Sequence, residues 1–219
     1  MTKKPETINQ EDLIKRKDGL YYKKYTKIPF TGTSEQFHTN GQLENRENYK
    51  NGIPHGSYEI FFKKGQLEFR GNYKNGNLEG LGELFHENGQ LCERRHYKNG
   101  NLEGLVEIFH DNGQLKMRGN YKNGKEHGFF EHFRDNGQLT RKGNVKNNKK
   151  EGLWEEFDIN GQLTNKINYK NGELVEDELK IEFGSTKDMS EKNNIKNGWV
   201  EELFQRHGFF KKILEELVE

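Results

Sequence analysis

The sequence predicts an all-β protein, an elongated single-sheet antiparallel meander of tandem β-hairpins. A unit of 24 residues recurs six times, and its tripeptide Gly-Gln-Leu begins at Gly41, Gly65, Gly89, Gly113, Gly137 and Gly161. Each unit also contains two turn signals, such as Asn75-Gly76 and Asn88-Gly89. Asn-Gly between alternating runs is a strong hairpin signal, because both residues tolerate positive φ. Two antiparallel strands per repeat follow from this pattern.

The composition favours a repeat array rather than a protein with one closed globular core. Hydrophobic residues make up 30% of the chain, charged residues 32%, and alanine is absent, a balance that by itself favours disorder. However, 15 Phe, 9 Tyr and 25 Gly with only 3 Pro suit short strands and tight turns. Because a repeat needs to bury surface only against its neighbours, this composition is sufficient for a solenoid-like array.

The length of the second turn leaves two strand registers open. A two-residue loop places Glu83 opposite Arg94, which gives every repeat an ion pair of about 0.2–1 kcal/mol. A three-residue loop with a glycine bulge places Phe85 opposite Leu91 instead. Burial of Phe or Leu contributes about 1.5–3 kcal/mol each. The bulged register is therefore favoured, with Leu, Phe and Tyr as the stacked core.

The repeats divide the chain into three parts. Residues 1–18 are expected to be a flexible N-terminal segment, and residues 19–172 the hairpin array. Residues 173–219 read as a degenerate repeat followed by a short amphipathic helix that caps the array. The helix is predicted from apolar residues at helical spacing, namely Phe209, Phe210, Ile213, Leu214 and Leu217.

The repeat unit resembles a known family. The pattern Asn-Gly-Gln-Leu-x(5)-Asn-Tyr-Lys-Asn-Gly, followed by Gly-x-x-Glu-x-Phe, is similar to variant MORN repeats, and the architecture resembles the YwqK family of bacterial antitoxins. This resemblance covers about residues 19–172. It implies a hairpin array that acts through protein contacts, with antitoxin or immunity activity that neutralises a partner toxin directly. MORN proteins of other kinds are associated with membranes and with scaffolding. The 24-residue period of this chain departs from the better known eukaryotic form, which argues against transferring lipid binding to it.

The repeat spacing argues against catalysis and metal binding. Equivalent positions in successive repeats lie about 10 Å apart, so the column of His38, His86 and His110 cannot share one zinc ion. The column of glutamates that includes Glu83 and Glu107 recurs without the asymmetry that an acid–base pair needs. Nothing marks the single cysteine, Cys92, as a nucleophile. We expect a protein that is not an enzyme and has no cofactor.

Candidate binding residues are sought where the repeats differ. The column of Tyr58, Gly82, Val106, Phe130 and Trp154 is the most variable and the most aromatic. In the bulged register it lies on the face opposite the Phe and Leu core, where large aromatics are typical interface anchors. An equally open alternative is that sheet curvature or the C-terminal segment covers this face. The candidate partner-binding residues are Tyr58, Phe130, His132, Trp154 and Trp199.

Charge suggests a second surface. The net charge is +1, so no nucleic-acid partner is expected. The Tyr-Lys-Asn-Gly turns nevertheless place lysines along one edge, namely Lys50, Lys74, Lys98, Lys122, Lys146 and Lys170. Two functions stay open: a protein-binding module whose partner is a toxin, or a membrane-associated scaffold whose lysine edge binds anionic lipid. Cytoplasmic location is the default expectation, and secreted or cell-surface location applies if a signal peptide has been removed.

Overall fold

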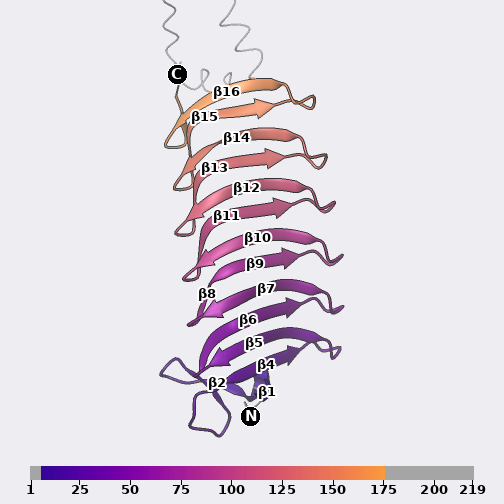
Figure 1. Ribbon diagram of the computed structural model, residues 1–219, viewed down its shortest axis with the longest axis vertical. Coiled ribbons are helices and arrows are strands. Elements are labelled where there is room, and N and C mark those ends of the chain that lie inside the picture. Colours follow the sequence, from indigo (N-terminus) through magenta and orange to yellow (C-terminus); the bar gives the residue numbers. More distant parts are fainter. Residues whose placement is uncertain (1–5, 176–219) are drawn as a thin grey trace, which may run out of the picture. The chain divides into compact units, whose positions relative to one another are not determined.

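Successive hairpins build a 15-stranded sheet in the computed structural model, which describes residues 6–175 (Figure 1). Neighbouring strands pair in an antiparallel manner except for β1 and β4, so the all-β hairpin prediction is confirmed. The path of the sheet runs through β1 (Glu6–Asn9), β4 (Gly32–Phe37), β5 (Leu43–Lys50), β6 (Ile53–Phe61), β7 (Leu67–Lys74), β9 (Gly80–Phe85), β10 (Leu91–Lys98), β11 (Asn101–Phe109), β12 (Leu115–Lys122), β13 (Lys125–Phe133), β14 (Leu139–Lys146), β15 (Lys149–Phe157), β16 (Leu163–Lys170) and β17 (Glu173–Leu174). The short strand β8 (Asn77–Leu78) pairs with β7 beside this path.

The N-terminal residues cover the first edge of the sheet. Strand β1 pairs in parallel with β4, and a 3₁₀ turn, η1 (Gln10–Asp12), leads into β2 (Leu13–Lys15), which pairs with β3 (Tyr21–Lys23). Ile8, Phe30 and Tyr49 form a buried cluster there. Residues 6–15 are therefore ordered, in contrast to the expected flexible segment 1–18, because an unpaired sheet edge gains hydrogen bonds and apolar burial from them.

One turn of each repeat is a two-residue hairpin. Both central residues have positive φ, for example 50° at Asn99 and 81° at Gly100, and the same geometry recurs at the other Tyr-Lys-Asn-Gly turns. Two successive positive φ angles define the type I′ turn, whose twist matches that of the flanking strands. Asn148 takes the place of the glycine once, at a φ of 65°.

The other turn combines the two registers that the sequence left open. His86 N–H donates to Gln90 O, so the loop has three residues and Phe85 pairs with Leu91, as the bulged register predicts. Cys92 is then an extra residue, because Glu93 pairs with Leu84 and Arg94 with Glu83. The same shift recurs in all six hairpins of this kind. Both cross-strand pairs therefore exist together, one on each side of a second bulge.

This second bulge decides which side chains share a face. Because side chains alternate along a strand, one extra residue moves all later side chains to the other face. Tyr97 thus lies on the face of Gly82, away from Phe85. We call the face with the tyrosines and the variable column the core face, and the face with Glu83 and Phe85 the ladder face. The expected common core of Leu, Phe and Tyr is wrong in this respect.

The predicted C-terminal cap lies outside the described residues. The described residues belong to a compact unit, Met1–Asp177, and the amphipathic segment with Phe209 and Leu217 falls beyond it. Among the helices of residues 6–175, none is long and apolar enough to cross a membrane.

Candidate partner-binding surfaces

The variable aromatic column is buried in the core face. Phe130 and Trp154 are only 2% and 3% exposed, and they pack with Val145. Each ring lies over a glycine of the neighbouring strand, since a Cβ atom at Gly119 would collide with Phe130 and one at Gly143 with Trp154. The indole Nε1 of Trp154 also donates to Asn144 O at 2.9 Å. Of the two alternatives that the sequence left open, a covered face therefore holds for Phe130 and Trp154, and an exposed one does not.

Volume complementarity explains why this column varies. Large rings lie beside a glycine: Tyr58 pairs with Gly71, Phe130 pairs with Gly143, and the Trp154 ring lies against Gly143. The ring centre of Tyr58 lies 5.3 Å from that of Tyr73. Burial raises the pKa of Tyr58. Variation within this column thus reflects packing between repeats.

Two further candidates have different outcomes. His132 is half-buried on the core face, and this burial, with Arg141 and Lys150 nearby, lowers its pKa to about 4. A neutral imidazole at this position fills the place that Ile60, Leu84 and Ile108 occupy in other repeats. Trp199 lies outside the described residues.

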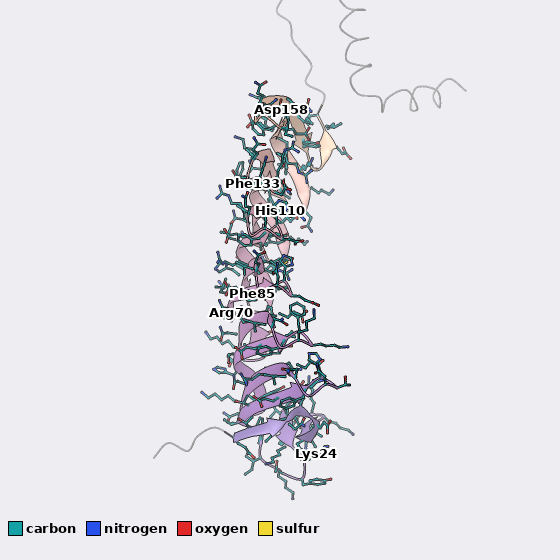
Figure 2. All side chains as sticks on the ribbon, turned by 90° about the vertical axis from the view of Figure 1, so that its right-hand side faces the viewer. Lys24, Arg70, Phe85, His110, Phe133 and Asp158 are labelled. Atoms are coloured by element: carbon teal, nitrogen blue, oxygen red, sulfur yellow. The ribbon has the colours of Figure 1, made fainter. Side chains whose placement is uncertain are left out.

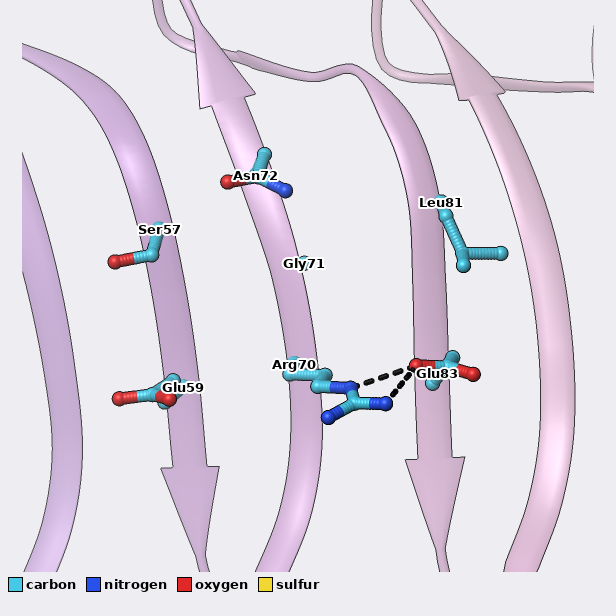
Figure 3. Close-up of a pocket in the computed structure, with 7 residues that line it drawn as sticks. All are labelled: Ser57, Glu59, Arg70, Gly71, Asn72, Leu81 and Glu83. Atoms are coloured by element: carbon cyan, nitrogen blue, oxygen red, sulfur yellow. Dashed lines mark hydrogen bonds and ion pairs between the residues drawn. The ribbon is translucent and has the colours of Figure 1, made fainter.

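The ladder face carries a row of alternating carboxylates and cations. Arg70 binds Glu83 with 2.6 Å between Nη2 and the carboxylate (Figure 3). Arg94 lies 3.5 Å from Glu83 and 3.0 Å from Glu107. Equivalent pairs join Arg46 to Glu35 and Glu59, Arg118 to Glu131, and Lys142 and Lys166 to Glu155. A hydrogen bond from Lys142, with support from Lys166, lowers the pKa of Glu155. These carboxylates link neighbouring strands and neutralise the cations beside them.

The same cations cover the phenylalanine column. Arg70 lies 5.4 Å from the ring centre of Phe85 (Figure 2). Lys142 lies 5.5 Å from the ring centre of Phe157. The Arg94–Phe109 and Arg118–Phe133 pairs are similar, at 6.0 Å. Such cation–π contacts contribute about 0.5–1 kcal/mol each when exposed. These four phenylalanines are thus shielded, which limits their value as anchors for a partner, whereas Phe37 of the first repeat is 47% exposed.

An exposed apolar column remains on the ladder face. Its members, which we call the apolar stripe, are Leu81, Leu105, Phe129 and Leu153. They are between 37% and 48% exposed and sit at equivalent positions of four consecutive repeats. Each pairs across the strand with a polar residue, His96, Asn120, Asn144 or Asn168. The 24-residue spacing shows this column in the sequence, and alternation along one strand places it on the face of Glu83 and Phe85. The bulge puts the tyrosines on the other face.

The stripe ends in a shallow hollow. Ser57 occupies the next position of the same column, and the missing side chain leaves an open hollow of about 220 Å³. Leu81 and Asn72 border it, while Glu59, Arg70 and Glu83 line its lower part (Figure 3). The apolar surface that a partner could contact therefore ends at the polar residue Ser57.

The lysine edge lies where the sequence places it. Lys50, Lys74, Lys98, Lys122, Lys146 and Lys170 are all exposed, each directly before a type I′ turn. Their binding of an anionic surface remains a prediction.

Histidines and the cysteine serve structural positions. Nε2 of His38 contacts Phe61 O at 2.9 Å, and Nε2 of His110 contacts Phe133 O at 3.0 Å, so these rings bridge successive repeats. Within the described part of the chain, no group of three or more metal-ligating side chains lies close together. Burial raises the pKa of the Cys92 thiol, which disfavours its nucleophilic thiolate form.

Comparison with known proteins agrees with the repeat unit. The family model described as the MORN repeat variant matches residues 30–51, 54–75, 78–99, 102–123 and 150–171, half of the chain. No curated protein matches the sequence. A solved structure described as a GtfA/B complex bound to UDP and GlcNAc is 18% identical over 47% of this chain. Only 20% of that longer chain is covered, and the TM-score of 0.20 gives no basis for inference.

Proposed function

Because this chain belongs to the MORN repeat variant family, whose repeats are generally protein- or membrane-binding modules, we propose that it is a non-enzymatic module that binds a partner protein through the apolar stripe. The observation that carries this proposal is the row of four exposed apolar side chains on an otherwise charge-paired face. Contiguous exposed apolar side chains bordered by polar residues are typical of protein interfaces.

The geometry of the stripe also indicates the shape of the partner. Two strands per repeat place successive stripe residues about 10 Å apart. Residues i and i+7 of an α-helix are about 10.5 Å apart along its axis. An amphipathic helix with apolar residues every seven positions therefore fits the stripe. The glutamates and arginines beside the stripe already neutralise each other. We therefore expect the partner helix to carry no strong net charge.

Substitution within the stripe tests this function. Ser57 already occupies the column, so Leu105→Ser combined with Phe129→Ser introduces a residue that the fold accepts there. The partner is first obtained by co-purification with the wild-type chain and identified. Its affinity for the double variant should fall about tenfold or more, because central apolar anchors dominate interface energies.

The matched control is Ile159→Ser, which removes an exposed apolar side chain from a turn away from the stripe. It should bind the purified partner as tightly as the wild type does. Equal affinity of the double variant and the wild type, with both folded, would show that the stripe is not the binding surface.

The more specific assignment that we propose is an antitoxin or immunity protein. The resemblance to the YwqK family supports it, and a sequestering contact needs no catalytic group. Co-expression with the product of the adjacent gene tests it: that product should arrest growth alone, and the wild-type chain should restore growth. A harmless gene product, or toxicity that the chain leaves unchanged, counts against the antitoxin role.

A second candidate is a scaffold that binds anionic membranes through the lysine edge. The exposure of all six turn lysines along one edge supports it. Binding to vesicles of phosphatidylcholine and phosphatidylserine should weaken steeply with salt, because exposed charges are screened within about 10 Å at 0.1 M. Vesicle binding that does not respond to salt would oppose this candidate.

A further inference from the structure

The type I′ turns share an anion position at the backbone. The amide of Asn99 donates to a carboxylate oxygen of Glu79 at 2.9 Å. The amides of Asn123 and Asn171 donate in the same way to Glu103 and Glu151, both at 2.8 Å. In the first repeat the hydroxyl of Thr31 accepts from Asn51 at 2.9 Å. A carboxylate oxygen thus marks where an anion binds on three of these turns.

The internal carboxylate is absent beside Asn147, as it is beside Asn51 and Asn75, and of these turns the one at Asn147 has the most lysines around it. His127 occupies the glutamate column beside the turn at Asn147, and its Nδ1 atom is buried without a hydrogen-bond partner. The next residue, Asn148, replaces the usual glycine. The family model matches five repeats and leaves out the repeat 126–147. The repeat that ends at the Asn147 turn is therefore the one that departs from the family pattern.

Lysines face each other across this turn and across the one before it. Lys146 pairs with Lys149, and Lys122 pairs with Lys125. Like charges directly opposite each other destabilise a strand pair unless a counter-charge is present. The four side chains are exposed, which leaves them accessible to an external anion.

The other turns differ in this respect. The lysine pairs with Ile53, Asn77, Asn101 or Glu173 at the remaining type I′ turns. Carboxylates near the lysine cluster are already engaged: Glu103 and Glu151 hold turn amides, and Glu126 accepts from the Tyr121 hydroxyl at 3.3 Å. Within the described residues the lysines that form ion pairs are Lys23, Lys64, Lys142 and Lys166, none of which belongs to this cluster.

We propose that the turn at Asn147 binds a phosphate-class oxyanion, free or as a phosphate monoester. The backbone amide of Asn147 donates to the anion as Asn99 donates to Glu79. Lys125, Lys146 and Lys149 supply the positive charge, and a dianionic phosphate satisfies more of it than a single carboxylate does. This inference is independent of partner binding at the apolar stripe.

The Asn147 amide itself provides the measurement. Inorganic phosphate is titrated into ¹⁵N-labelled protein at constant ionic strength, with chloride as the balancing anion. The Asn147 amide signal should shift and saturate, while the signals of Asn99 and Asn123, whose amides are already bound, stay in place. An Asn147 signal that does not move, or moves equally with chloride, overturns the proposal.

A substitution that closes the site separates binding from folding. His127→Glu places the carboxylate of the other repeats at the Asn147 amide, so the protein should remain folded and unfold at a higher temperature. Its phosphate affinity should fall about tenfold or more, as expected for the loss of one charge-assisted contact. Unchanged phosphate affinity in this variant contradicts the site.

His55→Glu is the matched control. His55 holds the equivalent position beside the turn at Asn75, where Lys74 faces Asn77 instead of a second lysine. This variant should leave the phosphate titration of Asn147 unchanged. A comparable loss of affinity would mean that the phosphate effect is not local to the Asn147 turn, which overturns the assignment.

The source of the anion is decided with two probes. Phosphatidylcholine vesicles doped with phosphatidic acid are compared with a soluble phosphate monoester, using wild type and His127→Glu. Loss of vesicle binding in the variant supports a lipid headgroup, and loss only with the soluble ester supports a free ligand. If the wild type binds both probes and His127→Glu binds them equally well, the proposal is contradicted.

Discussion

Glycine and aromatic side chains complement each other across neighbouring strands of the core face. Gly119 and Gly143 are the residues over which Phe130 and Trp154 lie. Gly82 has the same relation to Tyr97, because a Cβ atom there would lie 2.8 Å from the ring. The sequence shows that the column of Tyr58, Gly82, Val106, Phe130 and Trp154 varies in size. It does not show that the variation is compensatory, since that conclusion requires the cross-strand register.

Gly119→Ala tests this packing at a single atom. Gly119 has no positive φ, so alanine meets no backbone penalty and the cost is steric. Overpacking of this kind costs about 1–3 kcal/mol in the free energy of unfolding. Combining it with Phe130→Val should recover part of that cost, because the smaller side chain vacates the space. Denaturant unfolding of the two single variants and the double variant measures the coupling; strictly additive losses would contradict the proposed contact.

The second bulge is the element that determines the two faces. Sequence reasoning identified both cross-strand pairs, Glu83 with Arg94 and Phe85 with Leu91, and treated them as alternatives. Both are present because Cys92 is an extra residue between them. Bulges have no strong signature in the amino-acid types: the extra position is Glu44, Glu68, Cys92, Lys116, Thr140 or Thr164. The strands, turns and repeat were therefore predictable, and so was the position of Phe130 and Trp154 on the face opposite the phenylalanine column. The move of the tyrosines onto that same face, which the bulge causes, was not.

Deletion of Cys92 should be far more damaging than its substitution. Without the extra residue, Glu93 to Lys98 change faces, so Tyr97 leaves the core face and Arg94 leaves Glu83. We expect β9 and β10 to lose their cooperative unfolding transition. Hydrogen exchange of the backbone amides in these strands measures this loss. Cys92→Thr copies the residue found at positions 140 and 164 and should stay within about 0.5 kcal/mol of the wild type. A deletion variant with wild-type protection of β10 would refute the role given to the bulge.

At the scale of the whole repeat array, the two faces have different tasks. The core face holds neighbouring repeats together through Phe130, Val145 and Trp154. The ladder face links them through ion pairs and leaves the apolar stripe exposed. In a repeat protein each unit contacts only its neighbours, so a surface column extends regularly along the array. The binding surface that we propose is therefore a regular column, the apolar stripe, and not the most variable one.

Methyl NMR on the complex with the purified partner tests this assignment most directly. The methyl signals of Leu81, Leu105 and Leu153 should shift strongly when the partner binds, because they lie on the stripe. Those of Val106 and Val145, which are buried in the core face, should change little. The opposite result, with shifts confined to Val106 and Val145 and an unchanged stripe, would contradict the account.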